Sequence, residues 1–344
     1  MAQVLPQKRL GIVLFFIFLS CFSCLFRNSE ITLPDSVATT TLYSSDTHQN
    51  LQQIVLQAIN RANQSIVVII YSLQDPVIIS ALKNKAAQGV HVTVLYDPVA
   101  SIDAAWHLGE KIKALPVRSS RGLMHLKLIS IDKKEAWIGS CNLSTDSLLL
   151  HGNLLFGFSS ETMAQLIELR ALQLQKIEPQ QALPYCIQGK KQDYQIFFSP
   201  QQGKLALDKI EALIQSAQKT IKVASYTFTN DRICQNLIDA HKRGVQVQVI
   251  FDRDSAAHTS LKTIQKLQRA HVTTSVRKIQ GLMHHKFAVI DDTTLIMGSA
   301  NWTKAAFTIN DEITCVVHPL TPTQQDIMKK TWDAMVESST LPSK

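Results

Sequence analysis

Residues 281–301 read GLMHHKFAVIDDTTLIMGSAN, and residues 122–142 read GLMHLKLISIDKKEAWIGSCN. Both stretches follow the pattern H-x-K-x4-D-x6-G-S-x-N and align without a gap. Six fixed residues at fixed spacing would match by chance about once in 10^7 starting positions. Two matches in one chain of 344 residues therefore indicate a duplicated unit.

The duplication extends upstream of this pattern. Residues 66–75 (IVVIIYSLQD) match residues 221–230 (IKVASYTFTN) at an offset of 155 residues. The offset in the motif region is 159, so the second copy holds four extra residues between the two regions. Further pairs at the first offset are Tyr71 with Tyr226, Gly89 with Gly244 and Asp97 with Asp252.

Each copy alternates strand and helix signals. A β-branched run at 66–71 or 221–226 is followed by a helix-length segment that ends at a glycine, and then by a short apolar strand at 90–96 or 245–251. This alternation predicts an α/β fold with a largely parallel sheet in each half.

The repeat divides the chain into five parts. We expect the first half at residues 39–160 and the second half at residues 194–344. Residues 161–193 begin with helical periodicity and run into prolines, so they are expected to connect the halves. Residues 27–38 are expected to form a flexible tether, and residues 1–26 a signal peptide or membrane anchor.

The N-terminal segment has the pattern of a targeting sequence. Lys8 and Arg9 precede residues 10–26, which are apolar and uncharged. This run is long for a signal-peptide core and lies at the lower limit for spanning a bilayer, so a cleaved signal and an uncleaved anchor both stay open. With the basic end held in the cytoplasm, the body is expected outside it, as an exported or membrane-anchored protein.

The net charge limits the kinds of partner, and the cysteine positions limit the kinds of cofactor. The formal charge is +8; residues 1–26 hold two of these positive charges and no acid, so the remainder carries +6. This surplus favours a polyanionic partner, either nucleic acid or an anionic membrane surface. The four cysteines outside the apolar segment match no metal or disulfide pattern, so we expect buried free thiols and no metal or other cofactor. They are Cys141, Cys186, Cys234 and Cys315.

Strand periodicity groups the motif residues by face. Residues two apart in a strand share a face, so His125 points with Lys127, and His284 with Lys286. An imidazole beside a fixed ammonium suits attack on a phosphate, because one supplies a nucleophile or proton and the other neutralises oxygens. These four residues are the predicted catalytic set, whereas His285 has the opposite parity and is expected to face away.

The remaining motif positions are expected to support this set. The aspartates lie seven residues from the histidines and are predicted to be structural, and the glycines to permit close backbone approach. The serine and asparagine share a face and are predicted to bind or position phosphate. These residues are Asp132, Gly139, Ser140 and Asn142 in the first copy and Asp291, Gly298, Ser299 and Asn301 in the second.

In these motifs the chain resembles the phospholipase D superfamily, and the resemblance covers roughly residues 40–318. The second copy, GLMHHKFAVIDDTTLIMGSANWT, is similar to compact bacterial endonucleases and to the mitochondrial cardiolipin-hydrolase branch. Those proteins carry one motif per chain and dimerise, whereas this chain holds both, so a monomer is expected. The resemblance implies two pseudo-twofold-related α/β/α halves with one active site at their interface.

The resemblance also implies roles. One histidine attacks phosphorus to form a phosphohistidine, the other protonates the leaving alcohol, and the lysines and asparagines bind phosphate. Family members usually carry an acid about eleven residues after the motif asparagine; Glu312 holds that position in the second copy, but Asn153 holds it in the first. Since each acid is expected to reach across to the other copy's histidine, Glu312 would orient His125 as nucleophile and leave His284 as general acid. Asp146 stays open as a carboxylate for the first copy.

The expected function is that of a metal-independent phosphodiesterase. The apolar N-terminus and the apolar run at 148–150 favour phospholipid head groups as substrate, with phosphatidic acid as product, and a membrane surface as partner. The basic body favours the alternative, an endonuclease acting on DNA or RNA. A third possibility, a non-catalytic lipid- or nucleic-acid-binding module, is opposed by two intact motifs.

Overall fold

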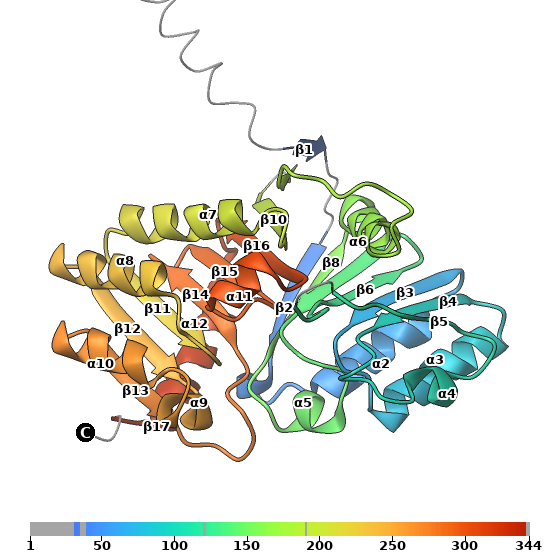
Figure 1. Ribbon diagram of the computed structural model, residues 1–344, viewed down its shortest axis with the longest axis horizontal. Helices are drawn as coiled ribbons and strands as arrows, with labels where there is room; N and C mark the ends of the chain where they lie inside the picture. The colour runs from blue at the N-terminus through green and yellow to red at the C-terminus, as the bar shows by residue number, and fades with distance from the viewer. Residues whose placement is uncertain (1–30, 35–38, 120–121, 190, 342–344) are drawn as a thin grey trace, which may run out of the picture.

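The computed structural model describes residues 31–34, 39–119, 122–189 and 191–341. Two β-sheets lie side by side with helices packed on them (Figure 1). The first sheet has the order β2-β8-β7-β6-β3-β4-β5. Its strands are β2 (Thr39–Ser44), β3 (Ser65–Ile70), β4 (His91–Tyr96), β5 (Lys113–Pro116), β6 (Lys127–Ile131), β7 (Glu135–Gly139) and β8 (Leu154–Ser159).

The second sheet repeats this order in seven of its strands. The order β10-β16-β15-β14-β11-β12-β13 matches the first sheet strand for strand, with β1 and β9 added beyond β10 and β17 beyond β13. The duplication seen in the sequence is therefore a duplication of topology. The strands are β1 (Ile31–Pro34), β9 (Tyr185–Gln188), β10 (Asp193–Ser199), β11 (Thr220–Ser225), β12 (Gln246–Phe251), β13 (Thr273–Arg277), β14 (Lys286–Ile290), β15 (Thr294–Gly298), β16 (Glu312–His318) and β17 (Ser339–Thr340).

Each half combines parallel and antiparallel pairs, so the prediction of a largely parallel sheet is wrong. In the first half, β3, β4 and β5 run parallel, whereas the pairs β3–β6, β6–β7, β7–β8 and β8–β2 are antiparallel. The reason lies in the motif itself: β6 and β7 are joined by a tight turn, and such a connection allows only an antiparallel neighbour. The α/β architecture in two related halves is confirmed.

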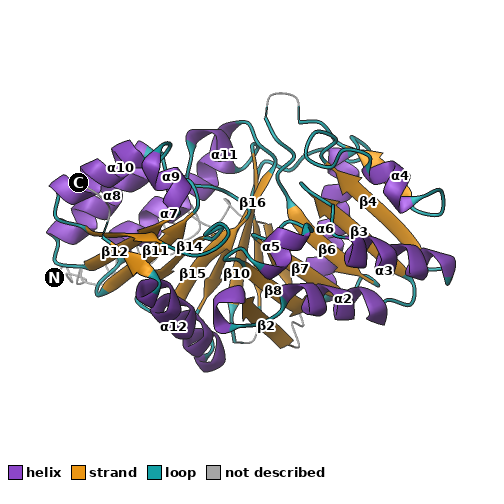
Figure 2. Ribbon diagram, turned by 90° about the horizontal axis from the view of Figure 1, so that it is seen from below, coloured by secondary structure: helices purple, strands orange, loops and turns teal. Residues whose placement is uncertain are grey.

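The helices also occur in related pairs (Figure 2). Asp75 caps the first helix after β3 by accepting from two backbone N–H groups, and Asn230 does the same after β11. The pairs are α2 (Leu51–Arg61) with α7 (Gly203–Ser216), α3 (Pro76–Ala87) with α8 (Asp231–Lys242), α4 (Ala104–Leu108) with α10 (Leu261–Arg269), α5 (Thr145–Leu149) with α11 (Lys304–Thr308), and α6 (Glu161–Leu174) with α12 (Pro322–Glu337).

The four extra residues of the second copy can be placed. The Ser101 hydroxyl accepts the Leu73 N–H at 3.0 Å, and the Ser260 hydroxyl accepts the Phe228 N–H at 3.0 Å, so the two serines are equivalent. The insertion therefore lies between Asp252 and Ser260, where the second half has the short helix α9 (Arg253–Ala257).

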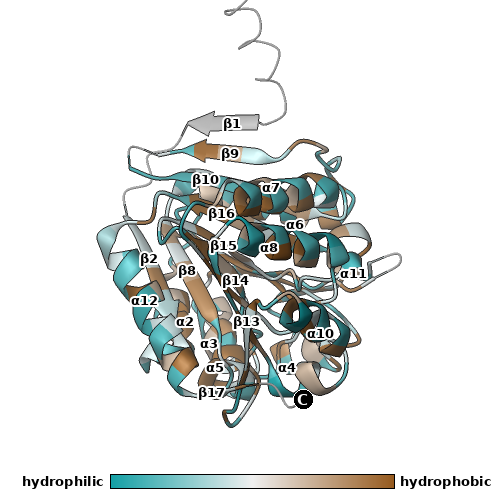
Figure 3. Ribbon diagram, turned by 90° about the vertical axis from the view of Figure 1, so that its left-hand side faces the viewer, coloured by the Kyte–Doolittle hydropathy of each residue, from teal (hydrophilic) through white to brown (hydrophobic). Residues whose placement is uncertain are grey.

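Three apolar clusters form the core. One cluster joins the halves and includes Leu42 and Phe156 from the first and Ile196 and Phe287 from the second. The other two lie within single halves, beneath α2 and α3 or beneath α7 and α8. Figure 3 shows hydrophobic strands behind α7 and α8, whose visible faces are largely hydrophilic. The four cysteines predicted to be free thiols are buried, and none of them forms a disulfide within the described residues.

Part of the predicted tether is strand. β1 falls within residues 27–38 and pairs in parallel with β9, which itself falls within the predicted connector (Figure 3). This pairing satisfies backbone groups along one edge of β9, whose other edge pairs with β10. The segment predicted as signal or anchor, residues 1–26, lies outside the described residues. Within the part of the chain that is described, no helix combines the length and the apolarity needed to cross a bilayer.

Candidate active site

The two motif histidines meet where the halves join. Lys127 opens β6 and Lys286 opens β14, and each histidine lies two residues earlier. Isolated parallel bridges tie Met124 to Asp311 and Gly152 to Met283, so the segment before each motif runs beside the end of the other copy. The topology thus brings both predicted catalytic pairs to one place between the sheets.

His125 is held by a carboxylate from the other half. Its Nδ1 lies 2.9 Å from Oε2 of Glu312, which is fully buried. Ser299 donates to the same oxygen at 2.5 Å, and Asn310 donates to Oε1 at 3.2 Å. Because the carboxylate accepts, Nδ1 of His125 carries the proton and Nε2 keeps its lone pair. Burial lowers the pKa of His125, against the opposing effect of Glu312.

His284 has an amide in the corresponding place. Its Nδ1 lies 3.1 Å from Oδ1 of Asn153, and the same oxygen accepts the Ser140 hydroxyl at 2.7 Å. The amide orientation is fixed because its Nδ2 donates to the Ser147 carbonyl at 2.8 Å. Asn153, and not Asp146, is therefore the partner of His284. Burial, followed by the charges of the two motif lysines, lowers the pKa of His284 well below its ordinary value.

The two lysines are buried in matching positions. Nζ of Lys127 donates to the His125 carbonyl at 2.8 Å, and Nζ of Lys286 donates to the His284 carbonyl at 2.7 Å. Each ammonium lies 5.1 Å from the ring centre of the strand-end tyrosine of its own copy. Burial lowers the pKa of Lys127 to about 7, and burial together with Lys127 lowers the pKa of Lys286 well below its ordinary value. An anion placed between the two ammonium groups would offset the burial and the repulsion that lower these pKa values.

The serine and asparagine of each motif do different work. Ser140 and Ser299 are buried and donate to Asn153 and Glu312, so they position the groups that hold the histidines. Asn142 and Asn301 each leave a buried Oδ1 without a hydrogen-bond partner among the described residues. These amides remain available to a ligand.

The motif glycines allow two strands to approach closely. A Cβ on Gly139 would lie 2.7 Å from the Leu154 carbonyl oxygen, and a Cβ on Gly298 would lie 2.1 Å from that of Ile313. Gly298 also has a φ of 147°, outside the usual range of other residues. This close approach brings β8 and β16 up to the motif strands; Asn153 immediately precedes β8, and Glu312 is the first residue of β16.

The motif aspartates bind backbone. Asp132 accepts the N–H groups of residues 63–65 at 2.7–2.8 Å, and Asp291 accepts those of residues 218–220 at 2.7–2.9 Å. Burial alone would raise their pKa, but the three donors outweigh it and lower the pKa of each carboxyl. Each aspartate follows its motif strand, at the end opposite to the lysine. It binds the turn after that strand to the start of β3 or β11.

Several residues that support the site were not identified from the sequence. Asp97 accepts the Met124 N–H at 3.2 Å and Asp252 accepts the Met283 N–H at 2.9 Å, so each carboxylate holds the peptide just before a catalytic histidine. Their pairing across the repeat was a usable signal. The long-range ion pair of Arg170 with Asp311 at 2.8 Å left no signal in the sequence.

A second buried ion cluster crosses the interface. Asp46 from the first half binds both Arg277 and Nε2 of His285. Burial would raise the pKa of the Asp46 carboxyl, but His285 and Arg277 outweigh it and bring the pKa to about 2. His285 thus faces away from the catalytic pair, as strand parity predicted, and helps to fasten the halves.

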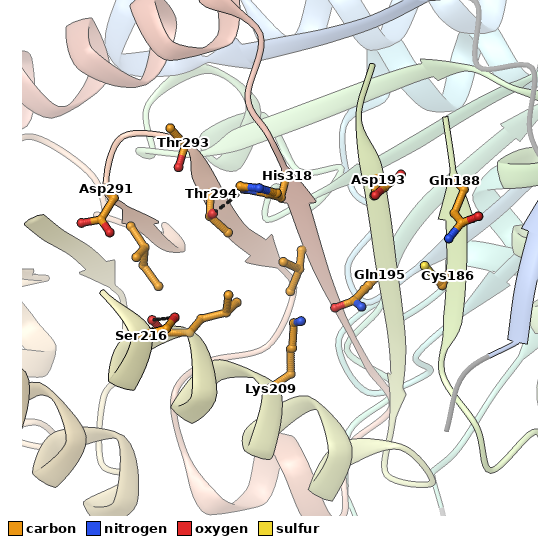
Figure 4. Close-up of a pocket in the computed structure, with 13 residues that line it drawn as sticks. Cys186, Gln188, Asp193, Gln195, Lys209, Ser216, Asp291, Thr293, Thr294 and His318 are labelled. Atoms are coloured by element: carbon orange, nitrogen blue, oxygen red, sulfur yellow. Dashed lines mark hydrogen bonds between the residues drawn. The ribbon is translucent and has the colours of Figure 1, made fainter. Parts of the chain in front are cut away.

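A separate cavity of about 510 Å³ lies at the far end of the second-half motif hairpin (Figure 4). Its lining includes Asp291, Lys209, and His318 hydrogen-bonded to Thr294 at 2.9 Å. Lys286 and Asp291 stand at opposite ends of β14, about 15 Å apart at the rise of a strand. This cavity is therefore distinct from the paired-histidine site.

The chain is similar to known proteins in both halves. The family model described as "Cardiolipin synthase, PLD-like domain" matches residues 55–173 and 210–333. A mitochondrial cardiolipin hydrolase of Chlamydomonas reinhardtii is 37% identical over 130 residues, which are 37% of this chain and 58% of that protein. A phospholipase D of Rickettsia bellii is 34% identical over 122 residues, which are 35% of this chain and 58% of that protein. The chain thus spans a little over half the length of these relatives.

The fold is shared with a solved structure over most of both chains. The phosphatidylserine synthase of Haemophilus influenzae superposes with a TM-score of 0.68 at 13% identity, over 90% of this chain and 89% of that one. At that identity the likeness concerns the fold alone. Since the family model covers both halves and each matched half contains a complete His-x-Lys motif, the chain belongs to the phospholipase D superfamily.

Proposed function

We propose that the protein is a phosphodiesterase that works through a covalent phosphohistidine. The observation that carries the proposal is the pairing of His125 with Glu312 and of His284 with Asn153, across the interface of the halves. In each ring the hydrogen-bond partner holds the proton on Nδ1, so Nε2 on the other side of the ring can react. A buried lysine lies beside each histidine. Two such rings can divide nucleophile and acid between them.

The proposed first step uses His125 as nucleophile. Its Nε2 lone pair forms a bond to phosphorus while the phosphorus–oxygen bond to the leaving alcohol breaks. The phosphorylated imidazole is cationic, and the buried Glu312 carboxylate stabilises that charge. His284 takes up a proton at Nε2 once the phosphate anion offsets the burial and the lysine charges that lower its pKa, and it gives that proton to the departing oxygen. An amide partner suits this role, because a carboxylate would hold the proton more tightly.

The proposed second step reverses these roles. Neutral His284 takes a proton from water, the water oxygen bonds to phosphorus, and the bond from phosphorus to His125 breaks. Lys127 and Lys286 neutralise the phosphate oxygens in both steps, and the Nδ2 groups of Asn142 and Asn301 donate to them. No metal or redox cofactor enters the balance of either step.

For substrate, we propose a phospholipid whose head-group alcohol is released, leaving phosphatidic acid. Support comes from the matched family description and from relatives named cardiolipin hydrolase and phospholipase D. The apolar segment at 10–26 and the net charge of +8 suit work at an anionic membrane, and we propose export or membrane tethering through that segment. With both motifs in one chain, we propose a monomer.

An endonuclease is the second candidate. The positive charge that suits anionic lipid also suits nucleic acid, and a phosphohistidine mechanism serves either diester. The geometry of the catalytic pair therefore suits a phosphodiester in either kind of substrate.

The test is a substrate panel with EDTA present throughout. Purified protein is incubated with vesicles of mixed phospholipids and with single- and double-stranded DNA and RNA, beside a His125→Ala variant. We expect release of head-group alcohol by the wild type alone. Efficient cutting of nucleic acid with every phospholipid intact would replace the lipid proposal by the nuclease, and binding without turnover would leave a non-catalytic module.

A further inference from the structure

The segment that follows β4, a loop that runs into α4 and is called the apolar loop below, exposes three large apolar side chains. Val99 is 72% exposed, Ile102 is 70% exposed and Trp106 is 79% exposed. All three fall within eight residues of the first half. Side chains of this size are normally buried, so a cluster of them at the surface calls for a partner.

This apolar loop is rigidly held, so the exposure is built into the fold. The Asp97 carboxylate accepts the N–H groups of Val99 and Ala100 at 2.9 and 3.1 Å. Ser101 is fully buried, and its hydroxyl donates to the Tyr71 carbonyl at 2.8 Å. Leu108, further on in the same segment, is buried at 1% exposure. The loop backbone is anchored to the protein while its apolar side chains point away from it.

The same anchors place the apolar loop beside the catalytic site. Asp97 also holds the Met124 N–H, one residue before His125, and the Tyr71 ring lies edge-on to His125 at 4.8 Å. Other exposed apolar residues border the site: Leu123 precedes Met124 at 41% exposure, and Leu150 precedes His151 at 48% exposure. The His151 ring centre is 6.3 Å from that of His284.

The second half provides an internal comparison. Since Ser101 and Ser260 are equivalent, Trp106 corresponds to Gln265, and buried Leu108 corresponds to buried Leu267. The shared fold therefore needs the leucine but not the tryptophan. The counterpart helix α10 carries three positive side chains, at Lys262, Lys266 and Arg269. Ile102 corresponds to Leu261, which is 40% exposed, so the apolar character is kept at that position, whereas it is lost at Trp106 and positive charge is added at neighbouring positions of α10.

We propose that the loop of Val99, Ile102 and Trp106 is a membrane-docking element that inserts into an anionic phospholipid surface beside the catalytic site. Tryptophan suits the boundary between head groups and acyl chains, where its ring is apolar and its N–H stays hydrated. The basic α10 and the overall charge of +8 complement an anionic leaflet. This docking surface rests on the proposal that the substrate is a phospholipid, and it adds how the site reaches a lipid in a bilayer.

Tryptophan fluorescence gives a direct readout of membrane docking. Trp137, Trp302 and Trp332 are each at most 6% exposed, so Trp106 is the one that a solvent or lipid quencher can reach. Full-length protein is mixed with vesicles of phosphatidylcholine and phosphatidylglycerol, with and without brominated acyl chains. We expect a blue shift of emission and quenching by the bromolipid, both absent in Trp106→Gln, which copies the second half.

Catalysis tests the same surface independently. In the triple variant Val99→Ser, Ile102→Ser, Trp106→Gln we expect turnover of vesicle lipid to fall at least about tenfold. Turnover of a soluble short-chain phospholipid should stay within twofold of the wild type. Ile177→Ser, which removes a 61% exposed apolar residue on the connector, is the matched control and should change neither.

Three outcomes would overturn the docking proposal: Trp106 emission unchanged by vesicles, a shift caused by single-stranded oligonucleotide and not by vesicles, or a shift that follows protein concentration without lipid, as in self-association. Failure of the proposed substrate gives a different pattern. In that case the bromolipid still quenches Trp106, but neither vesicle nor soluble phospholipid is hydrolysed.

Discussion

Replacing Glu312 by glutamine tests the division of roles between the two histidines. The substitution keeps the size of the side chain and gives His125 the same kind of partner that His284 already has. It removes one negative charge from a fully buried position 2.9 Å from Nδ1. In the proposed intermediate the His125 ring is cationic. The variant therefore loses a charge-assisted hydrogen bond to the ring on which positive charge develops.

The expected cost follows from that contact. A hydrogen bond to a charged group contributes about 1.5–3 kcal/mol, and a preorganised group acting on developing charge about 3–4 kcal/mol. We therefore expect kcat to fall about 10²–10³-fold. The loss should be at the upper end of this range, because Glu312 is also the acceptor for Ser299 and Asn310, which lose a full charge as partner.

The pH profile separates this role from a merely structural one. Glu312 opposes the burial that lowers the pKa of His125, so its removal lowers that pKa further. A nucleophile must be unprotonated, and the acid limb of kcat/KM should therefore move to lower pH while the rate falls. Damage to the fold would reduce the amount of active protein without moving the limb.

The assay combines rate with trapping. Protein is quenched during turnover in denaturant kept free of acid, and the phosphohistidine is mapped by mass spectrometry; we expect it on His125. Glu135→Gln, at a partly exposed ion pair with Arg61, is the control of equal charge change. The reasoning is refuted if Glu312→Gln keeps kcat within threefold, or if the adduct lies on His284 and persists in His125→Ala.

Four further predictions follow from the described contacts. Replacing either Lys127 or Lys286 by alanine should cost at least about 3 kcal/mol in kcat/KM, and full activity in both variants would contradict the site. Because the pKa of Lys127 is about 7, its ammonium is present below that pH, so kcat/KM should fall as pH rises through 7, and an unchanged rate up to pH 9 would count against its charge. Asp132→Asn should lower the free energy of unfolding by about 2–3 kcal/mol in urea titration and leave kcat within threefold. Asp46→Asn strands the buried Arg277 charge and should cost about 3–5 kcal/mol. Since the pKa of Asp46 is lowered to about 2, about 2 kcal/mol of this difference should be lost as pH falls from about 4 towards 2, and a difference unchanged over that range would disprove the linkage.

Most of the predictions made from the sequence rest on the duplicated motif. Parity along the strands separated His125 and Lys127 from Asp132, because side chains alternate between faces. The structure has these groups at opposite ends of β6, with the aspartate bound to backbone. Identical spacing in the second copy extended the same reading to His284.

What the sequence could not supply was contact across the interface. Nothing local to Asp46 indicates that it binds Arg277 and His285, more than 200 residues away. The same holds for Arg170 and Asp311, since long-range partners depend on how the sheets are placed. The sheet direction was mispredicted for a related reason: the helix-rich first part of each copy is parallel, whereas the motif hairpin is antiparallel.

The exchange of Glu312 in the second copy for Asn153 in the first is also where the chemistry can become directional. Two identical copies would give each histidine the same acid, and neither ring would be committed to attack. Here Asn153 keeps the geometry of that contact, with Ser140 bonded to it as Ser299 is to Glu312, but it removes the charge. The ring beside the carboxylate is favoured as a cation and the ring beside the amide is favoured as a proton donor. Duplication within one chain makes this possible, because the two positions can change separately, whereas two identical subunits must change together.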